Sequence, residues 1–295
     1  MARIEGDAAT LLGRDARSTP QTGPEAVADA LVASATAAID ASGASLADIS
    51  AAGLSAPGPL DHRTGVILVT QNIAGFKDTP LAAMVESRLG GPEVFLDRDT
   101  VMAAIGEGLA GAARGARDFV YLTVSTGVGG AIVSGGRMVR GASDTAGELG
   151  HFPVGFDRDV RCRCGSFGCV EAYAAGRNLA EAYGVEDASV VYAKAAAGDS
   201  RAAALIARAE LALSNLAVGI VNALNPERIV VGGSVAEHEP GHVLEPMRRA
   251  IAERAFKAPA AAVQVVPSAL AGDVSIVGSA LAARDRSSGG GQWFL

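Results

Sequence analysis

The sequence predicts an α/β protein of two domains, and three observations support this prediction. Short apolar runs that suit buried strands alternate with longer stretches whose apolar residues recur at helical spacing, the pattern of layered α/β folds. Hydrophobic residues make up 49% of the 295 residues and aromatic residues only 4%, while 37 glycines supply many tight turns. The length allows one large domain or two ordinary ones, and the stretch RGAR at residues 114–117 interrupts the pattern where two domains could join.

Strands and helices alternate in the first third of the chain. The apolar residues of 25–41 recur at helical spacing behind a Thr22-Gly23-Pro24 start. The elements expected after it are strand 49–54, strand 66–69, helix 80–89, strand 94–96 and helix 100–113. The cluster Ser55-Ala56-Pro57-Gly58-Pro59 indicates a turn between the first two of these strands.

The rest of the chain begins with an expected hairpin. It consists of strand 119–124, a glycine-rich turn at 125–130 and strand 131–133. Then follow a loop-rich segment 141–170, helices over 171–225, strand 228–233, helix 243–255, strand 263–266 and helix 274–284. We therefore expect a first domain over 1–115, a second over 116–275 with the cysteine-rich segment 151–169, a C-terminal helix over 276–286 that returns to the first domain, and a flexible tail over 287–295.

Charge and hydropathy argue against several classes of partner. The net charge of −7 gives no concentrated basic face for nucleic acid or an anionic membrane. The N-terminus lacks the apolar run of a secretory signal. The most apolar long stretch, 211–224, is interrupted by Ser214, Asn215 and Asn222 and is shorter than the roughly 20 residues of a membrane span. We expect a buried helix there, in a cytoplasmic protein.

The three cysteines, Cys162, Cys164 and Cys169, form one cluster in the sequence. An odd number cannot pair within one chain, so a disulfide framework is not expected. Thiolates suit zinc, and the Gly-x-x-Gly turn before Cys169 lets the backbone fold tightly enough for the three to converge. His151 lies eleven residues before Cys162 and completes a Cys₃His set. Four protein ligands would make the site structural. The alternative is a group of buried, reduced cysteines without metal.

These residues carry a resemblance to the ROK family, which contains bacterial repressors, uncharacterised open reading frames and sugar kinases. ELGH at 148–151, followed by Cys-x-Cys-Gly-x-x-Gly-Cys-x-Glu at 162–171, resembles the family's zinc signature. STGVGG at 125–130 looks like its second phosphate loop, and GASDTAGE at 141–148 is similar to its "RGA…AGE" stretch. Residues 228–234 and 55–59 resemble its adenosine-binding strand and its early turn, so the resemblance runs from about residue 8 to 284.

The resemblance implies an actin-like ATPase fold of the ribonuclease H-like, hexokinase type, in which two α/β domains close over ATP and a sugar. The implied reaction moves the γ-phosphoryl group of ATP to a hexose 6-hydroxyl with Mg²⁺. Asp99 matches the catalytic base, a role that a carboxylate within reach of the hydroxyl can perform. Seen alone, Asp99 is better interpreted as the N-terminal cap of the helix that it opens.

The resemblance also implies the binding residues. Glu148, His151, Glu171 and, as a guess, Asn72 match sugar contacts, and zinc on one nitrogen of His151 would order the sugar loop. Phosphate would lie on Ser125, Thr126, Gly127, Gly129 and Gly130, and adenosine against Gly232 and Gly233. Without the resemblance, Glu171 is a plain helix-start carboxylate and the glycines form ordinary turns.

Two features depart from the family pattern. ROK kinases open with a strand that carries an Asp-x-Gly-Gly-Thr phosphate loop, and residues 1–295 contain no such motif. We therefore expect either a misassigned start or a chain that turns over poorly, because phosphoryl transfer depends on positioning and charge neutralisation. Arg98 stands where the family commonly has an Asn that holds sugar hydroxyls. Arg cannot accept a hydrogen bond, which weakens the expectation of plain glucose as substrate.

Three hypotheses follow. The first is an ATP-dependent hexokinase, with glucokinase ahead of kinases for N-acetylglucosamine or N-acetylmannosamine. The second is a non-catalytic sugar-binding or regulatory relative, and the third a degraded relative that keeps zinc but binds no ligand. An acidic chain without a helix-turn-helix argues against a DNA-binding repressor. Family members are often dimers or tetramers, so we expect a homo-oligomer.

Overall fold

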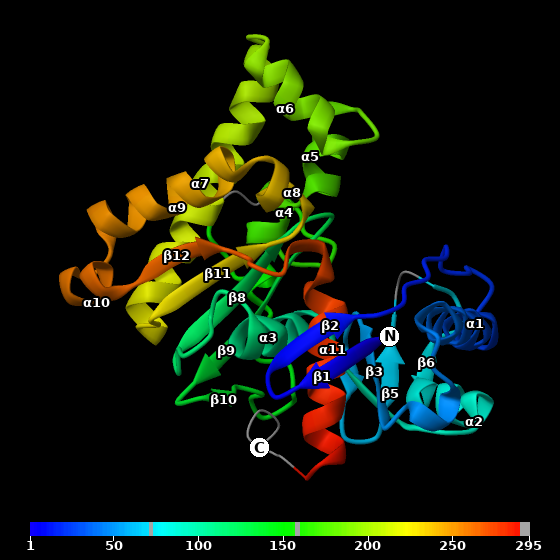
Figure 1. Ribbon diagram of the computed structural model, residues 1–295. Helices are drawn as coiled ribbons and strands as arrows, with labels where there is room; N and C mark the ends of the chain where they lie inside the picture. The colour runs from blue at the N-terminus through cyan, green and yellow to red at the C-terminus, as the bar shows by residue number, and fades with distance from the viewer. Residues whose placement is uncertain (71–72, 157–159, 290–295) are drawn as a thin grey trace. The chain divides into compact units, whose positions relative to one another are not determined.

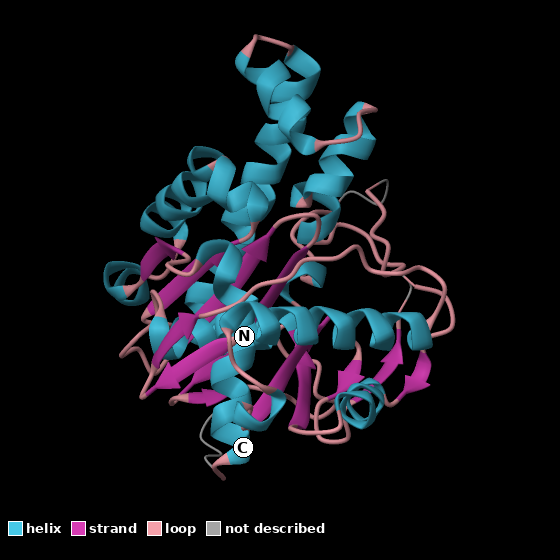
Figure 2. Ribbon diagram, turned by 45° about the vertical axis from the view of Figure 1, so that its right-hand side comes forward, coloured by secondary structure: helices cyan, strands magenta, loops and turns pink. Residues whose placement is uncertain are grey.

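The structure is a computed structural model that describes residues 1–70, 73–156 and 160–289. The chain divides into two compact units. Unit 1 comprises Met1–Arg114 and Asp273–Leu295, and unit 2 comprises Gly115–Gly272. Both units combine helices and strands (Figure 2).

Unit 1 contains three small sheets and four helices. Its strands are β1 (Ala2–Glu5), β2 (Ala8–Leu11), β3 (Ala51–Ala56), β4 (Leu60–Asp61), β5 (Val66–Val69), β6 (Lys77–Thr79) and β7 (Glu93–Arg98). Its helices are α1 (Pro24–Ser42), α2 (Leu81–Leu89), α3 (Asp99–Ala110) and α11 (Val274–Ser287), with a short 3₁₀ turn, η1 (Leu46–Asp48). β3 and β7 pair in parallel, β1 and β2 form an antiparallel hairpin, and β4, β5 and β6 form an antiparallel sheet (Figure 1).

Helix α11, which comes from the far end of the sequence, packs closely on α3 and β3. A Cβ at Gly278 would lie 1.8 Å from the Met102 carbonyl oxygen, and one at Gly106 would lie 3.0 Å from the Val274 oxygen. The two helices therefore meet backbone to backbone. Gly53 of β3 makes an equally close contact, because its Cβ would lie 2.0 Å from the Ser279 oxygen. Small residues at these positions join the C-terminal helix to unit 1.

A groove of about 920 Å³ runs through unit 1, lined by β1, β3, α1 and α11. Among the described strands, β1 pairs with β2 alone and β3 with β7 alone. Ser279 lines the groove, and its buried Oγ has no hydrogen-bond partner among the described residues.

Unit 2 is built on a five-stranded sheet in the order β10-β9-β8-β11-β12. The strands are β8 (Phe119–Val124), β9 (Val128–Ser134), β10 (Arg137–Met138), β11 (Arg228–Gly232) and β12 (Gln264–Pro267). β8, β11 and β12 run in parallel, whereas β9 and β10 are antiparallel to their neighbours. The carboxyl ends of the parallel strands thus meet at one edge, where α/β folds commonly bind their ligands.

Helices surround this sheet and supply most of the apolar core of unit 2. They are α4 (Val170–Ala174), α5 (Gly176–Tyr183), α6 (Ala188–Ala196), α7 (Ser200–Leu224), α8 (Ser234–His238), α9 (Pro240–Arg254) and α10 (Lys257–Ala262). The 3₁₀ turn η2 (Leu149–His151) precedes α4, and the 3₁₀ turn η3 (Ala271–Asp273) leads from unit 2 into α11 of unit 1. α7 and α9 lie side by side (Figure 1). Their buried faces join β8 and β11 in one cluster that includes Leu213, Leu216, Ile229 and Met247.

Helix α7 is the one helix, within the described ranges, that is long and apolar enough to cross a membrane. Half of its most apolar stretch is buried within the structure, as in a core helix of a globular protein. The helix expected over 211–224 is confirmed as its second half. The helix is buried on one face, because Leu213, Leu216 and Ile220 are at most 3% exposed while Leu211 is 57% exposed.

Two local predictions need correction. The turn expected at 125–130 is shorter, because β9 already begins at Val128 and Gly129 and Gly130 pair with Thr123 and Leu122 of β8. The hairpin β1–β2 was not predicted at all. Its signal is present: Gly6-Asp7 is a two-residue turn between strands that pair Glu5 with Ala8, and Gly6 has a φ of 59°.

The close packing of α11 on α3 makes a stability prediction. Gly278→Ala should destabilise the protein by about 1–3 kcal/mol, because the new methyl would overlap the Met102 oxygen. Gly241→Ala is the matched control: Gly241 lies in α9, and a Cβ there meets nothing within 4 Å. Thermal unfolding should show a lowered midpoint for the first variant and an unchanged or raised one for the second. Equal midpoints would contradict the described helix contact.

Candidate functional site

Two turns meet at the carboxyl edge of the parallel strands in unit 2. The first, Ser125–Gly127, follows β8, and the second, Gly232–Ser234, follows β11 beside it. The hydroxyls of Ser125 and Ser234 lie 2.9 Å apart. Gly233 has a φ of 94°, and a Cβ there would lie 2.6 Å from the Val124 oxygen. Glycine is therefore required for the second turn to lie this close to the first.

Helix α5 fixes the first turn from the other side. The Gly176 N–H donates to the Ser125 carbonyl at 2.8 Å, and the Arg177 N–H donates to the Thr126 carbonyl at 3.4 Å. Within the turn, the Ser125 N–H donates to the Gly127 carbonyl at 2.8 Å. The turn is thus held in one shape by backbone bonds, while the Thr126 side chain is exposed.

A cavity of about 660 Å³ opens beside both turns. Thr126 and Ser234 contribute to its wall from the turns, and Arg177 and His238 from α5 and α8. Four carboxylates also line it, those of Glu181, Glu186, Asp187 and Glu239. Burial, followed by the negative charges of Glu239 and Glu210, raises the pKa of Tyr192 in its wall to about 12, so this hydroxyl remains a donor.

The segment before the cysteines lies directly on β9. A Cβ at Gly150 would lie 1.8 Å from the Val128 oxygen, and Gly147, with a φ of 94°, would bring one to 2.9 Å from the Gly130 oxygen. Because both positions are glycines, η2 packs on the strand backbone. Glu148 and His151, at the two ends of this contact, are thereby placed next to the start of β9.

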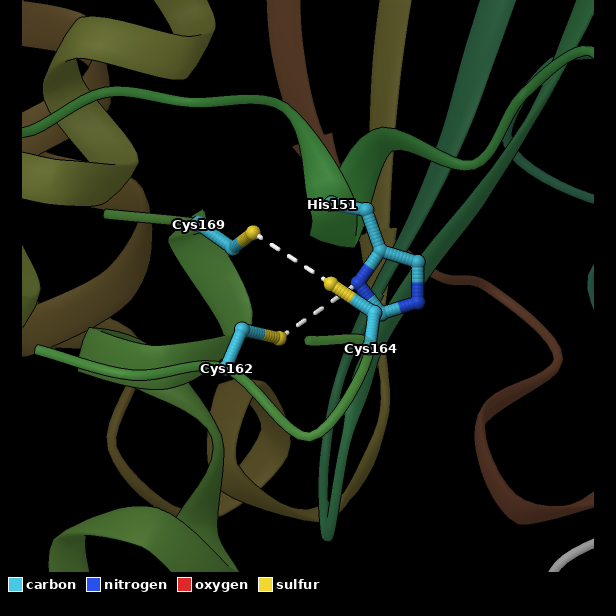
Figure 3. Close-up of side chains that lie close together, drawn as sticks. All are labelled: His151, Cys162, Cys164 and Cys169. Atoms are coloured by element: carbon cyan, nitrogen blue, oxygen red, sulfur yellow. Dashed lines mark hydrogen bonds between the residues drawn. The ribbon is translucent and has the colours of Figure 1, made fainter. Parts of the chain in front are cut away.

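His151 and the three cysteines converge, as the sequence analysis expected. One ligand atom from each lies within 4.8 Å of the other three (Figure 3). His151 Nδ1 is 3.6 Å from Cys162 Sγ, and Cys164 Sγ is 3.8 Å from Cys169 Sγ. The second ring nitrogen of His151 points away from the sulfurs (Figure 3). Three thiols and one imidazole on a common centre are a donor set that fits Zn²⁺.

Local pairing explains this convergence. A bridge between Pro153 and Cys169 places the segment after His151 against the last cysteine. A second bridge, between Arg161 and Phe167, closes the loop that carries Cys162 and Cys164. Gly165 and Gly168 have φ values of 91° and 65°, a conformation that most other residues rarely adopt.

The protein environment does not by itself stabilise the buried thiolates. Burial raises the pKa of the Cys162 thiol, and burial together with the neighbouring thiols raises that of Cys169 to about 12. A bound cation would reverse this, because a metal binds the thiolate form. Against the effect of burial, hydrogen bonds from the Ser166 backbone and the neighbouring thiols lower the pKa of the exposed Cys164 thiol. The two buried thiols of the cluster are therefore suited to a metal rather than to nucleophilic chemistry.

Glu171 is close to the first turn. It lies in α4, and its Oε2 accepts the Val128 N–H at 3.1 Å. A Cβ at Gly127 would lie 3.0 Å from the same oxygen. Glu148, His151 and Glu171 thus all lie around the start of β9 in unit 2, and their role as sugar contacts stays a prediction.

The candidate base belongs to unit 1. Asp99 is the first residue of α3 and follows β7 directly; its side chain is exposed, and its Oδ1 accepts the N–H of Thr100 at 2.8 Å. The N-cap of α3 is Arg98, which makes no side-chain cap bond, so the capping role considered for Asp99 is wrong; Asp99 is the acidic residue of the first turn, where a negative charge favours the helix. Arg98 is only 4% exposed, and a Cβ at Gly58 would lie 3.2 Å from its Cδ, so its side chain packs under the 55–59 turn. Asn72 lies outside the described residues.

Some residues of the site were not predicted. Ser234 could have been found, because a hydroxyl directly after a Gly-Gly turn is a common anion contact. Arg177, Tyr192 and His238 carry no such local signal, since helix packing alone brings them to the cavity.

Solved structures of other proteins share this geometry. The fold defines the chain as an α/β protein whose parallel strands end in glycine-rich turns. It is similar to a ROK hexokinase from Thermus thermophilus, with a TM-score of 0.79 and 35% identity over 97% of this chain and 94% of that one. It is also similar to a ROK family glucokinase from Streptomyces griseus in complex with glucose and AMPPNP, with a TM-score of 0.77 and 29% identity over 96% and 94%. The expected hexokinase-type, actin-like fold is thereby confirmed.

Sequence comparison agrees, and the chain belongs to the ROK family, which it matches over residues 3–286. It is 30% identical to a glucokinase of Thermotoga maritima over 80% of each chain. It is 34% identical to an N-acetylmannosamine kinase of Escherichia coli O9:H4 over 94% of each. A match to a Halalkalibacterium halodurans glucokinase, at 34% identity, covers 65% of this chain and 64% of that enzyme.

The geometry of the cluster predicts about one zinc ion per chain. His151→Ala or Cys169→Ser should weaken zinc binding by more than about 100-fold, because even changes outside the ligand shell of a zinc site cost up to that much. His242→Ala is the matched control, since His242 lies in the same unit but contacts Glu210. Metal content and competition with a chromophoric chelator measure this. Zinc binding by His151→Ala as tight as in the control would contradict the assignment.

Proposed function

We propose that this protein transfers the γ-phosphoryl group of ATP to the 6-hydroxyl of a hexose, with glucose as the first candidate. The observation that carries the proposal is the meeting, at the start of β9, of the His–Cys cluster, the carboxylate of Glu171 and the glycine-rich turn. Carboxylates and an imidazole, which can hydrogen-bond a polyol, beside a glycine-rich turn, which can bind phosphate, support the proposal. Membership of the ROK family supports the same reaction.

The nucleotide would occupy the cavity beside the two turns. The amides of Thr126 and Gly127 are the candidate phosphate donors, and Arg177 is the nearest candidate cation in the cavity wall. The carboxylates of the wall suit the donor groups of a ribose or an adenine. Mg²⁺ carried by the nucleotide would neutralise charge that develops on the phosphoryl oxygens.

The sugar would be held by Glu148, His151 and Glu171, whose carboxylates and imidazole match hydroxyl groups. Zinc on Nδ1 of His151 fits the geometry, because it would leave the second ring nitrogen to face the sugar. Asp99 would take the proton of the 6-hydroxyl as its oxygen attacks the γ-phosphorus. The bond from the γ-phosphorus to the bridging oxygen of ADP breaks in the same step.

N-acetylhexosamines are a second class of candidate substrate. The match to an N-acetylmannosamine kinase covers 94% of the chain, and Arg98 stands where the family commonly has Asn. We therefore propose N-acetylmannosamine or N-acetylglucosamine as the alternative acceptor. A non-catalytic sugar-binding protein is the third proposal, motivated by Arg98, which cannot accept a hydrogen bond from a sugar hydroxyl.

A coupled assay for ADP release over a panel of hexoses and N-acetylhexosamines tests the proposal. The assay uses residues 1–295 with each sugar in turn. Sugar-dependent ADP release supports the kinase. A sugar that raises the melting temperature without turnover would favour the binding protein instead.

The proposed base makes the sharpest prediction for activity. Asp99→Asn should lower kcat by about 10²- to 10⁴-fold with the preferred sugar, because the amide cannot accept the hydroxyl proton. Sugar affinity should change far less. Asp40→Asn, an exposed aspartate near the end of α1, is the charge-matched control and should keep full activity. Undiminished kcat in Asp99→Asn would exclude Asp99 as the base.

A further inference from the structure

Glu171 links the cysteine segment of unit 2, the expected metal site, to the 125–128 turn, the expected phosphate site. Its carboxylate accepts the Val128 N–H at 3.1 Å, and the same oxygen lies 3.0 Å from where a Cβ on Gly127 would be. The other end of the turn is held by backbone atoms of α5, at Ser125 and Thr126. Glu171 is therefore the side chain that fixes the Gly127–Val128 end of the turn.

The position of Glu171 depends in turn on the cysteine segment. Helix α4 begins directly after Cys169, the Ala172 N–H donates to the Cys169 carbonyl at 3.0 Å, and the Val170 N–H donates to the Phe152 carbonyl at 3.1 Å. Cys169 itself is completely buried. A short helix tied at its first turn to the cluster leaves Glu171 little freedom to move independently of it.

The exit of the helix is fixed as well. The Glu171 carbonyl accepts bonds from the Asn178 side chain at 3.0 Å and from the Ala175 N–H at 3.1 Å. Ala175 is followed by Gly176, whose N–H holds the Ser125 carbonyl. The cysteine segment, α4 and the start of α5 thus form one continuous support for the turn.

We propose that Glu171 is a positioning residue that couples occupation of the His–Cys cluster to the shape of the 125–128 turn, so that zinc strengthens nucleotide binding. The inference rests on the proposed function, because it takes the turn as the phosphate site. A cation at the cluster orders the segment around Cys169. That order reaches the Val128 amide through the Glu171 carboxylate. By linkage, bound nucleotide must tighten zinc by the same factor.

The coupling can be measured with the full chain and the Mg²⁺ complex of AMPPNP. Calorimetry on the zinc-loaded and zinc-free wild type should give about tenfold tighter nucleotide binding with zinc. Glu171→Ala should reduce this ratio to within about twofold. Glu171→Gln should keep most of the zinc-dependent gain in nucleotide affinity, because its amide oxygen still accepts the Val128 N–H. Loss of the charge can weaken sugar binding in this variant without changing that gain. Glu253→Gln, an exposed carboxylate on α9, is the control for charge alone.

Hydrogen exchange at residues 125–130 gives a second readout that needs no nucleotide. Zinc should slow exchange of the Val128 amide in the wild type and in Glu171→Gln, but not in Glu171→Ala. If removal of zinc unfolds the cysteine segment, the zinc-loaded variants are compared with each other. At equal zinc content, the Val128 amide should then exchange faster in Glu171→Ala than in Glu171→Gln.

An unchanged zinc effect in Glu171→Ala, or no zinc effect on the Val128 amide in the wild type, would overturn the coupling. Failure of the proposed function looks different. In that case no form binds AMPPNP, while the exchange of Val128 still reports whether Glu171 fixes the turn.

Discussion

The backbone contact between Gly150 and Val128 is the constraint on which the site of unit 2 depends. A Cβ at Gly150 would lie 1.8 Å from the Val128 oxygen, so only glycine lets η2 lie on β9. This contact places His151 beside the same strand whose first N–H is held by Glu171. The His–Cys cluster, the carboxylates of Glu148 and Glu171 and the glycine-rich turn are therefore grouped around one short piece of strand.

A metal would complete this arrangement. Backbone bonds fold the loop that carries the cysteines, among them those from the Cys162 N–H to the Ser166 carbonyl and from the Gly168 N–H to the Val160 carbonyl. Its buried thiols nevertheless have raised pKa values at Cys162 and Cys169. Binding of a cation favours the thiolates and joins His151 to this loop. A bound ion would order the segment that carries His151 and the cysteines. It would thereby orient the side chains of the expected sugar pocket, in the way that residues around a metal site orient its ligands.

Sequence reasoning reached the parts of the structure that local patterns determine. Strands 66–69 and 119–124 were predicted to the residue, because β-branched runs end at clear turns. The cysteine cluster was found because its ligands are close in sequence. Val128–Gly130 were taken for a loop, since two glycines normally argue against a strand; here they pair with β8, and a Cβ at Gly130 would lie 2.6 Å from Leu149 Cδ1. Arg177 and His238 reach the cavity through helix packing, which one sequence does not encode locally.

The central claim is that one cluster of metal ligands organises the sugar pocket. A crystal structure of the zinc-loaded protein with glucose or N-acetylmannosamine, measured at the zinc absorption edge, tests it most directly. The account predicts an anomalous peak between His151, Cys162, Cys164 and Cys169, and sugar hydroxyls on Glu148 and on the far nitrogen of His151. An empty cluster, or a sugar bound away from these side chains, would contradict it.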